Sequence, residues 1–212
     1  IPKKMLYYRS IEAHPIKLLF VPDEEITHQG SQADRLLAEE AQGCLCAFNL
    51  ETGRMDDCLT VGRKGCMDVW ITVHGKAGHV GNAYASSANA IEEMAHKIIA
   101  LRALTDLEKG RIVSTDIISG GTVSNAVADT CRIEVDCRYD YNEDKDALEK
   151  AIRAICAETH VPGTRTEVEF PAFMPVFERT EGNDRLLDLV NQAAAEFGLP
   201  AFGAAHPGGC SD

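Results

Sequence analysis

Three acidic residues, Asp23, Glu24 and Glu25, directly follow an apolar run at residues 16–21. A short apolar run between two prolines predicts a strand buried on both faces of an α/β sheet, and ligands of open α/β sheets bind at the carboxyl ends of the strands. Three carboxylates packed there repel one another unless a cation neutralises them. Zn²⁺ accepts carboxylate oxygen, and a neighbouring carboxylate can deprotonate its bound water. The cluster therefore predicts a metal site, with a polar turn as the alternative.

Glu51 is a second candidate ligand, because it ends the next apolar stretch, residues 45–50, and could meet Glu25 at the same edge of the sheet. Acidic pairs alone are weak signals, since two further Glu-Glu pairs of this chain lie in predicted helices, where a solvated face explains them. The cysteine and histidine spacings of zinc fingers are absent from the sequence, so a closed structural zinc site is not expected.

His79 stands in a loop with three glycines, Gly75-Lys76-Ala77-Gly78-His79-Val80-Gly81. Glycines let a backbone approach a ligand closely and aim the imidazole, with a flexible turn as the alternative. A second glycine-rich turn, residues 120–125, ends in the amide side chain of Asn125. Because a strand follows this turn and no lysine closes it, a phosphate-binding P-loop is rejected.

Arg138 lies on the polar face of a predicted strand, where it could bind a substrate carboxylate with two parallel hydrogen bonds. Arg132 lies on the same face, and either arginine could be the one that is merely solvated. Near the end of the chain, Gly208, Gly209 and Ser211 would present backbone N–H groups and a hydroxyl to an anionic or carbonyl ligand. Ser211 has no adjacent base, so it is not expected to act as a nucleophile.

The elements that must position these residues alternate between strands and helices. Periodicity predicts strands at residues 16–21, 45–50, 67–74, 112–119, 130–139 and 165–170. It predicts helices at residues 32–41, 87–104, 142–159 and 184–197, the first starting from a serine cap. From residue 66 to 170 the order is βαββαβ, the ferredoxin-like arrangement. The expected fold is an α/β domain in two pieces, residues 1–61 and 175–212, interrupted by an insertion at 62–174.

Composition excludes several classes of partner. The 212 residues carry 21 Lys and Arg against 33 Asp and Glu, a formal net charge of −12. Neither nucleic acid nor an anionic membrane is an expected partner, because both are bound through clustered basic residues. With 45% hydrophobic and 25% charged residues, the composition is that of an ordinary globular protein.

The eight cysteines are spread through the chain and are expected to be reduced thiols of a cytoplasmic protein, without a role in the site. No apolar run is long enough to predict a transmembrane helix. The chain begins at Ile1 with no signal-peptide pattern, and it stops on turn-forming residues where an element should begin. We therefore expect a segment of a longer protein.

Six stretches of this sequence together resemble the dinuclear zinc aminoacylase and carboxypeptidase family, which includes acetylornithine deacetylase, succinyl-diaminopimelate desuccinylase and glutamate carboxypeptidase. In order along the chain, they are Val21-Pro22-Asp23-Glu24-Glu25, Gly62-Arg63-Lys64-Gly65, the loop around His79, Gly120-Gly121 with Asn125, Asp136-Cys137-Arg138 and Gly208-Gly209-Cys210-Ser211-Asp212. The resemblance implies a zinc-peptidase catalytic domain, partial here, of mixed sheet and flanking helices, interrupted by a ferredoxin-like lid and dimerisation domain.

The resemblance also implies roles for the acidic residues. Glu24 looks like the family's general base, which activates a water between two metals, and Glu25 looks like a ligand of one metal. Glu51 looks like the acidic ligand of the other metal, with Asn49 as the competing alignment. The implied cofactor is two divalent ions, zinc first, with cobalt or manganese as alternatives.

Further roles fall on the insertion and on the last residues. His79 looks like the histidine that reaches the partner subunit's active site and stabilises the oxyanion, so a homodimer is implied. Asn125 and Arg138 look like substrate contacts, and Gly208, Gly209 and Ser211 resemble the substrate-binding loop. The implied reaction is hydrolysis of an amide or peptide bond in an N-acyl amino acid or dipeptide.

Several residues of the family pattern are absent from this sequence. The family's His-x-Asp metal motif and bridging aspartate should precede Ile1, and a last histidine ligand should follow Asp212. The 212 residues alone are therefore expected to be inactive. The alternative function is a non-catalytic dimerisation or binding module built on the βαββαβ domain.

Overall fold

The computed structural model describes residues 15–22, 24, 30–50 and 56–211. The chain divides into two compact units, Ile1–Phe48 and Asn49–Asp212, and each is considered separately. The predicted ligands Glu25 and Glu51 lie outside the described residues. No helix among the residues that are described has both the length and the apolar character needed to cross a membrane.

The first unit contains the helix α2 (Ala33–Ala41). This confirms the predicted helix but not its serine cap, because the N-cap residue is Gln32, without a capping side-chain hydrogen bond. Ser31 Oγ, one residue earlier, accepts a hydrogen bond from the backbone N–H of Ala33 at 3.1 Å. An ion pair of 2.8 Å between Lys17 Nζ and Glu40 Oε2 joins the preceding segment to the helix.

The two strands predicted on either side of this helix are wrong. Residues 16–21 form no strand, and Phe20 is 90% exposed. Residues 45–50 form none either, and Leu45 is 93% exposed. An apolar run becomes a strand only when neighbouring strands pair its backbone groups, and no strand lies among the described residues of the first unit. These two runs have the composition of buried strands without the partners that would bury them.

The second unit is built on an antiparallel sheet whose main strands are β2 (Gly65–His74), β4 (Ile112–Gly120), β6 (Thr130–Tyr139) and β7 (Arg165–Glu169). Their spatial order is β4-β6-β2-β7. With α4 (Ala90–Arg102) between the first two strands and α5 (Asn142–Ala157) between the last two, the chain order is βαββαβ, as predicted. The order of the strands is that of a ferredoxin-like fold, in which each helix connects two strands of one sheet.

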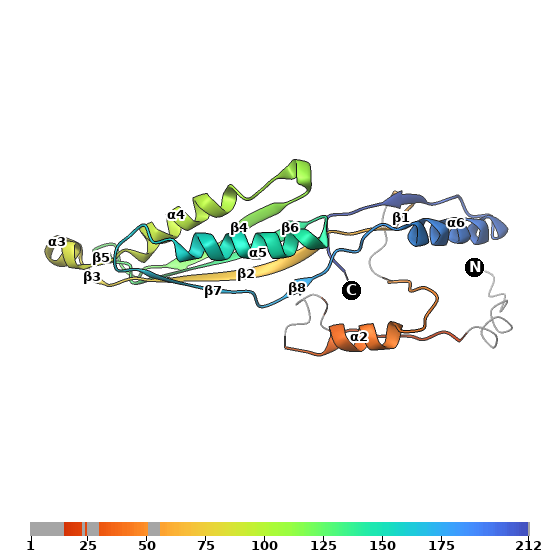
Figure 1. Ribbon diagram of the computed structural model, residues 1–212, viewed down its shortest axis with the longest axis horizontal. Coiled ribbons are helices and arrows are strands. Elements are labelled where there is room, and N and C mark those ends of the chain that lie inside the picture. Colours follow the sequence, from red (N-terminus) through yellow and green to blue (C-terminus); the bar gives the residue numbers. More distant parts are fainter. Residues whose placement is uncertain (1–14, 23, 25–29, 51–55, 212) are drawn as a thin grey trace. The chain divides into compact units, whose positions relative to one another are not determined.

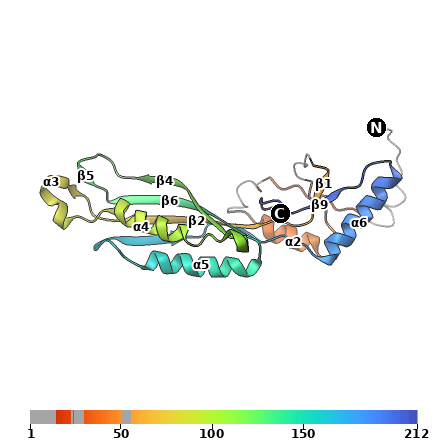
Figure 2. The same ribbon diagram turned by 90° about the horizontal axis from the view of Figure 1, so that it is seen from above.

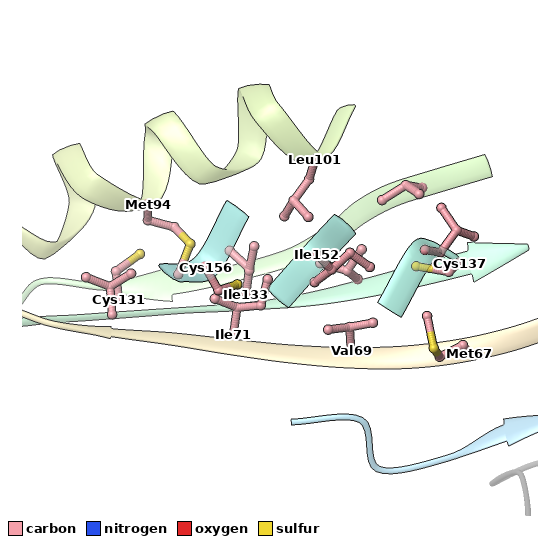
Figure 3. Packing of buried hydrophobic residues seen from close by; sticks show 14 of the residues in the cluster. Met67, Val69, Ile71, Met94, Leu101, Cys131, Ile133, Cys137, Ile152 and Cys156 are labelled. Carbon is pink, nitrogen blue, oxygen red and sulfur yellow. The ribbon is translucent and has the colours of Figure 1, made fainter. Parts of the chain in front are cut away.

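Both helices lie along one face of this sheet (Figure 2). The side chains between the helices and the sheet form the core of the unit, with methionine and cysteine sulfur among leucine, isoleucine and valine (Figure 3). In β6 the buried and partly exposed residues alternate from Cys131 to Tyr139, as its sequence predicts. The even positions of β6 therefore face away from the helices, and Arg138 is one of them.

Capping residues explain where the helices begin. Helix α4 starts at Ala90, three residues later than predicted, because the Asn89 side chain accepts hydrogen bonds from the N–H groups of Ile91 and Glu92. Helix α6 (Glu181–Glu196) starts three residues earlier than predicted, behind a capping box formed by Thr180 and Asn183.

Smaller elements complete the unit. Strand β1 (Cys58–Thr60) pairs in parallel with β9 (Gly203–Ala205), and β8 (Phe173–Met174) pairs with the start of β2. Strand β3 (Gly78–His79) pairs with β5 (Ala126–Val127) and leads into the short helix α3 (Val80–Ala83). The remaining turns are the 3-10 segments η2 (Tyr84–Ser86) and η3 (Leu107–Lys109).

The sheet has two ends that matter for function. We call the proximal end the one where β2 begins, at Gly65, and β6 ends, at Tyr139. The distal end is the one where β2 ends, at His74, and β6 begins, at Thr130. Strands β3 and β5 and helix α3 lie beyond the distal end (Figure 1).

Candidate functional site

The predicted metal ligands stay predictions. Glu24 is partly buried in the first unit, whereas Glu25 and Glu51 lie outside the described part of the chain. Within the described ranges, no three His, Cys, Asp or Glu side chains are grouped so that they could hold a metal ion. The site that can be built from side-chain contacts is therefore the one in the second unit.

Arg138, at the proximal end, is held by its own strand. Its Nε and Nη2 atoms donate to the two carboxylate oxygens of Asp136, both at 2.6 Å. Its Nη1 donates to the sulfur of Cys210 at 3.3 Å. These hydrogen bonds use three of the five N–H groups of a guanidinium. Asp136 thus fixes the orientation of Arg138 and leaves it two donors, enough for the carboxylate-binding role that the sequence predicts.

Arg132, the alternative to Arg138, is engaged elsewhere. Its guanidinium lies 4.7 Å from the ring centroid of Trp70, in a cation–π contact, and its Nη2 is 3.4 Å from Glu134 Oε1. These partners belong to the middle and distal part of the sheet. Arg138 is therefore the arginine placed beside the loop at the end of the chain.

The loop of Gly208 to Ser211 is fastened by side chains from three other segments. Arg63 Nη1 donates to the carbonyl oxygen of Cys210 at 3.1 Å, and Asn49 Nδ2 donates to Ser211 Oγ at 2.8 Å. Ser211 is buried. Asn49, the competing metal-ligand alignment, is thus engaged with Ser211 in this structure.

Neither backbone conformation nor packing against the described residues requires glycine at positions 208 and 209. Neither has a positive φ. A Cβ added to Gly208 would meet nothing within 4 Å, and one added to Gly209 would meet only Arg63 Nη1, at 3.7 Å. The bare backbone therefore has room for a close approach, and the predicted ligand contact at these glycines stays a prediction.

A pair of cysteines in this site was missed by the sequence reasoning, which gave the cysteines no role. The thiol of Cys66 donates to the sulfur of Cys210 at 2.7 Å. That hydrogen bond, together with the charge of Arg138, outweighs burial and lowers the pKa of Cys210 to about 7. The pKa of Cys66 is raised, first by its hydrogen bond to Cys210 and then by burial. The signal that could have placed Cys66 in this site is the cross-strand register, because Cys66 is the β2 residue opposite Arg138.

Packing at the proximal end explains another glycine. The Tyr139 hydroxyl donates to the carbonyl oxygens of Cys66 and Met174, both at 3.1 Å. The Tyr139 ring covers Gly65 so closely that a Cβ at Gly65 would lie 2.3 Å from it. Only glycine lets this ring brace the start of β2.

His79 and Asn125 meet beyond the distal end. His79 pairs with Ala126 in the β3–β5 ladder, and the carbonyl of Asn125 accepts a hydrogen bond from Val80 N–H at 3.0 Å. His79 Nδ1 accepts from Gly81 N–H at 3.1 Å. A neutral imidazole that accepts at Nδ1 carries its proton on Nε2. Both side chains are exposed, and His79 is arranged as a hydrogen-bond donor.

The glycines of the His79 loop have a different reason from the one expected. A Cβ at Gly75 would lie 2.2 Å from the carbonyl oxygen of Ala88, and one at Gly78 would lie 2.1 Å from Ser87 Oγ. Close packing against the segment before α4 therefore explains both, without a ligand. Gly81 alone has room for a Cβ, which would touch only the His79 ring, at 3.5 Å.

The candidate residues thus form two groups at opposite ends of one sheet. Arg138 is eight residues from Thr130, which is about 27 Å along a strand. His79 belongs to β3 and Asn125 directly precedes β5, and both of these strands lie beyond that distal end (Figure 1). No small substrate spans this distance, so residues of both groups cannot contact the same molecule within one copy of the chain.

Comparison with known proteins agrees with this architecture. Residues 61–164 match the family described as the peptidase dimerisation domain. The chain is 30% identical over 174 residues to carboxypeptidase G2 of a Pseudomonas species, covering 82% of this chain and 41% of that protein. It is 25% identical over 162 residues to a succinyl-diaminopimelate desuccinylase of Caulobacter vibrioides, covering 70% of this chain and 42% of that protein.

Among solved structures, the fold is similar to that of aminopeptidase PepT from Bacillus cereus, with a TM-score of 0.62 and 22% identity. That likeness covers 76% of this chain and 43% of the PepT chain. The chain therefore spans about two fifths of the length of each of these relatives.

Proposed function

Because the chain belongs to the M20 peptidase family, we propose that the hydrolase of which it forms all or part cleaves an amide or peptide bond in a small substrate bearing a carboxylate. Its relatives include a carboxypeptidase and succinyl-diaminopimelate desuccinylases. The observation that carries the proposal is the contact of Arg138 with Cys210, in the loop whose Gly208 and Gly209 leave open backbone. An N-acyl amino acid or a dipeptide offers the two matching groups, a carboxylate for the guanidinium and a carbonyl for the loop.

We assign residues 1–61 and 175–212 to two pieces of a catalytic domain and 62–174 to the lid and dimerisation domain. Within this chain, Glu25 and Glu51 are the proposed ligands of two divalent ions, zinc first, with cobalt or manganese as alternatives. Such ions polarise an amide carbonyl and lower the pKa of a bound water. Glu24 is the proposed base that takes the proton of the attacking water and delivers it to the leaving amine.

The proposed active form is a homodimer joined through the free edge of β4. The two edges of the sheet differ in chemistry. On β7 the edge sequence Arg165-Thr166-Glu167-Val168-Glu169 carries charges that discourage pairing with another strand. On β4 the edge is uncharged from residue 117 to 120, and Ile117 and Ile118 are more than half exposed. An exposed apolar edge of this kind is a template for pairing with a second copy.

A dimer also resolves the separation of the two groups of site residues. His79 of one copy can complete a site whose Arg138 and Gly208–Ser211 loop belong to the other copy. There the Nε2–H of His79 would donate to the oxyanion that forms at the amide carbonyl. Asn125, adjacent to His79 through β3 and β5, is the second contact that we propose for the same substrate.

The test is a hydrolysis screen over N-acyl amino acids and dipeptides with the complete protein, with and without added divalent metal. Glu24→Gln should abolish turnover while the metal content, measured by elemental analysis, stays unchanged. Glu39→Gln is the matched control, because Glu39 lies in the same unit on the exposed surface of α2 and should leave turnover intact.

Each other outcome also decides between the functions. Turnover that survives in Glu24→Gln would remove Glu24 from the role of base. A dimeric protein that binds no metal and hydrolyses none of these substrates would favour the alternative, a non-catalytic dimerisation module.

For the location we propose the cytoplasm, where the eight free cysteines would stay reduced.

A further inference from the structure

We propose that Cys66 and Cys210 are a redox-sensitive pair that closes into a reversible disulfide when the protein meets hydrogen peroxide. Both thiols are free in the structure, and their sulfur atoms are 2.7 Å apart. A disulfide bond is about 2.05 Å long, so bonding requires a shift of about 0.7 Å. The bond would fasten the Gly208–Ser211 loop to the first residues of β2.

The position of Cys66 shows that the contact is built by the fold. Cys66 is the cross-strand partner of Arg138, so both side chains lie on the face of the sheet away from the helices. Its neighbour Met67 points to the opposite face, into the core. Although Cys66 lies on the face without helices, it is only 3% exposed, and the sulfur that touches it is that of Cys210.

Two contacts hold Cys210 in this position, and a third holds the residue after it. Arg138 donates to its sulfur and Arg63 to its carbonyl oxygen. The next residue, Ser211, is held by Asn49. The two sulfurs are therefore kept together by charged and polar side chains of the strand and of the segment that leads into it.

The two cysteines have complementary roles in oxidation. Cys210 is partly exposed, and its pKa of about 7 gives it a large thiolate fraction near neutral pH. Cys66 is covered and holds its proton more tightly, so it suits the second, resolving step. Burial raises the pKa of Cys131, Cys137 and Cys156, which belong to the core and are protected from attack.

The chemistry balances with peroxide as the only oxidant. The Cys210 thiolate attacks one peroxide oxygen, the O–O bond breaks, and the hydroxide that leaves takes up a proton to become water. The Cys66 sulfur, after losing its proton, then attacks the Cys210 sulfenic acid. The S–S bond forms, the S–O bond breaks, and a second hydroxide leaves as water. Two thiols and one peroxide give one disulfide and two waters, and a dithiol reductant reverses the reaction by exchange.

The disulfide would also change the site. Cys210 would no longer accept the hydrogen bond of Arg138 as a thiolate, and the loop would lose its freedom to move relative to β2. The loss of hydrolysis that we expect from this change rests on the proposed function, whereas the disulfide itself does not.

Peptide mapping tests the proposal without any substrate. The reduced protein is treated with hydrogen peroxide, blocked with N-ethylmaleimide and digested with trypsin. Cleavage places Cys66 as the single cysteine of residues 65–76, and Cys210 is the single cysteine of residues 186–212, in the peptide that starts at Leu186. Mass spectrometry should find these two peptides linked in most of the folded protein, and dithiothreitol should separate them.

Variants supply the controls. Cys66→Ser should remove the link and leave Cys210 oxidised singly, while Cys58→Ser, at another partly exposed cysteine of the same unit, should leave the link intact. The proposal is overturned if folded wild-type protein oxidises Cys210 without linking it to Cys66, or links other cysteines in equal yield. If the protein hydrolyses a substrate, activity should fall with the link and return with dithiothreitol in the wild type, but not respond in this way in Cys66→Ser. If it hydrolyses nothing, the peptide map still decides.

Discussion

The two ends of the sheet, although built from the same strands, hold their candidate side chains in different ways. At the proximal end, Arg138 is joined by side-chain hydrogen bonds to Asp136 and to Cys210, so these three side chains have partners within the chain. At the distal end, His79 and Asn125 are held mainly through their backbones, and both side chains face solvent. The proximal end therefore holds its side chains through contacts within the chain, whereas the distal end leaves its side chains open to solvent.

A second difference lies beneath the surface. The distal half is braced from inside by Glu93 and Lys97 of α4, which are completely buried. Lys97 Nζ is 2.8 Å from Glu93 Oε1 and also donates to the carbonyls of Ile155 and Glu158, while Glu93 Oε2 accepts from two backbone N–H groups of the α5–β7 loop. Although burial opposes ionisation, Lys97 and these N–H groups lower the pKa of Glu93. This buried ion pair is thus separate from the candidate site residues at either end of the sheet.

The largest effect that separates the two ends is on stability. Lys97→Met should lower the free energy of unfolding by about 3–5 kcal/mol, because it leaves the Glu93 carboxylate buried without its cation. Arg138→Met should cost no more than about 1 kcal/mol, because the Arg138 and Asp136 side chains are 28% and 35% exposed. Urea unfolding followed by circular dichroism measures both. Equal losses would mean that the proximal cluster is structural.

The sequence predicts the four main strands of the second unit well because their signals are local. The alternation of β6, with Cys131 and Ile133 against Arg132 and Glu134, fixes both its bounds and its polar face. The apolar runs at 16–21 and 45–50 failed for the opposite reason: composition describes what a segment could bury, but a strand also needs neighbouring strands, and none lies among the described residues of the first unit.

The same limit applies to the site. Arg138 could be found from its strand, and the loop of Gly208 and Gly209 from its glycines. The contact of Cys66 with Cys210 joins residues 144 positions apart, and no local pattern encodes it. The glycines before His79 were interpreted as room for a ligand, whereas Gly75 and Gly78 make room for neighbouring parts of the chain itself.

If each active site combines Arg138 of one subunit with His79 of the other, variants of these two residues should restore each other's activity in a mixed dimer. His79→Ala and Arg138→Ala should each lower kcat/KM of the complete enzyme by about 10²-fold, because each removes a donor to the substrate or the oxyanion. After the two inactive variants are mixed and allowed to exchange subunits, half the dimers are mixed, and each of these holds one intact site of two. Activity should recover to about one quarter of the wild-type value.

The matched control for this experiment is each variant subjected alone to the same exchange, which should recover nothing. Absence of recovery in the mixture, when exchange is confirmed by mass spectrometry, would place both residues in the same copy's site and contradict the assignment of the two ends.

The edge of β4 gives a smaller effect on the same dimer. Ile118 lies opposite Ile133, on the helix-covered face of an edge strand, and is 58% exposed. Ile118→Lys should weaken the dimer at least about tenfold, since it replaces apolar surface that the second copy would bury. Thr166→Lys on the β7 edge should leave the dimer unchanged, because that edge is already charged. Sedimentation equilibrium measures both dissociation constants, and equal weakening would show that the β4 edge has no special role.

The smallest expected effect tests the charge state of the proximal end. Cys66 and Arg138 are the groups that stabilise the Cys210 thiolate, whose pKa of about 7 lies below that of an ordinary thiol. The thiolate reacts and the thiol does not, so the rate of alkylation by iodoacetamide should rise about tenfold between pH 6 and pH 8. In Cys66→Ser the same rise should move to higher pH. The smaller serine side chain does not reproduce the hydrogen bond by which the Cys66 thiol lowers the pKa of Cys210. A profile in the wild type that keeps rising beyond pH 9 would mean that Arg138 and Cys66 do not hold Cys210 as an anion, and the contrast between a prepared proximal end and an exposed distal end would lose its electrostatic basis.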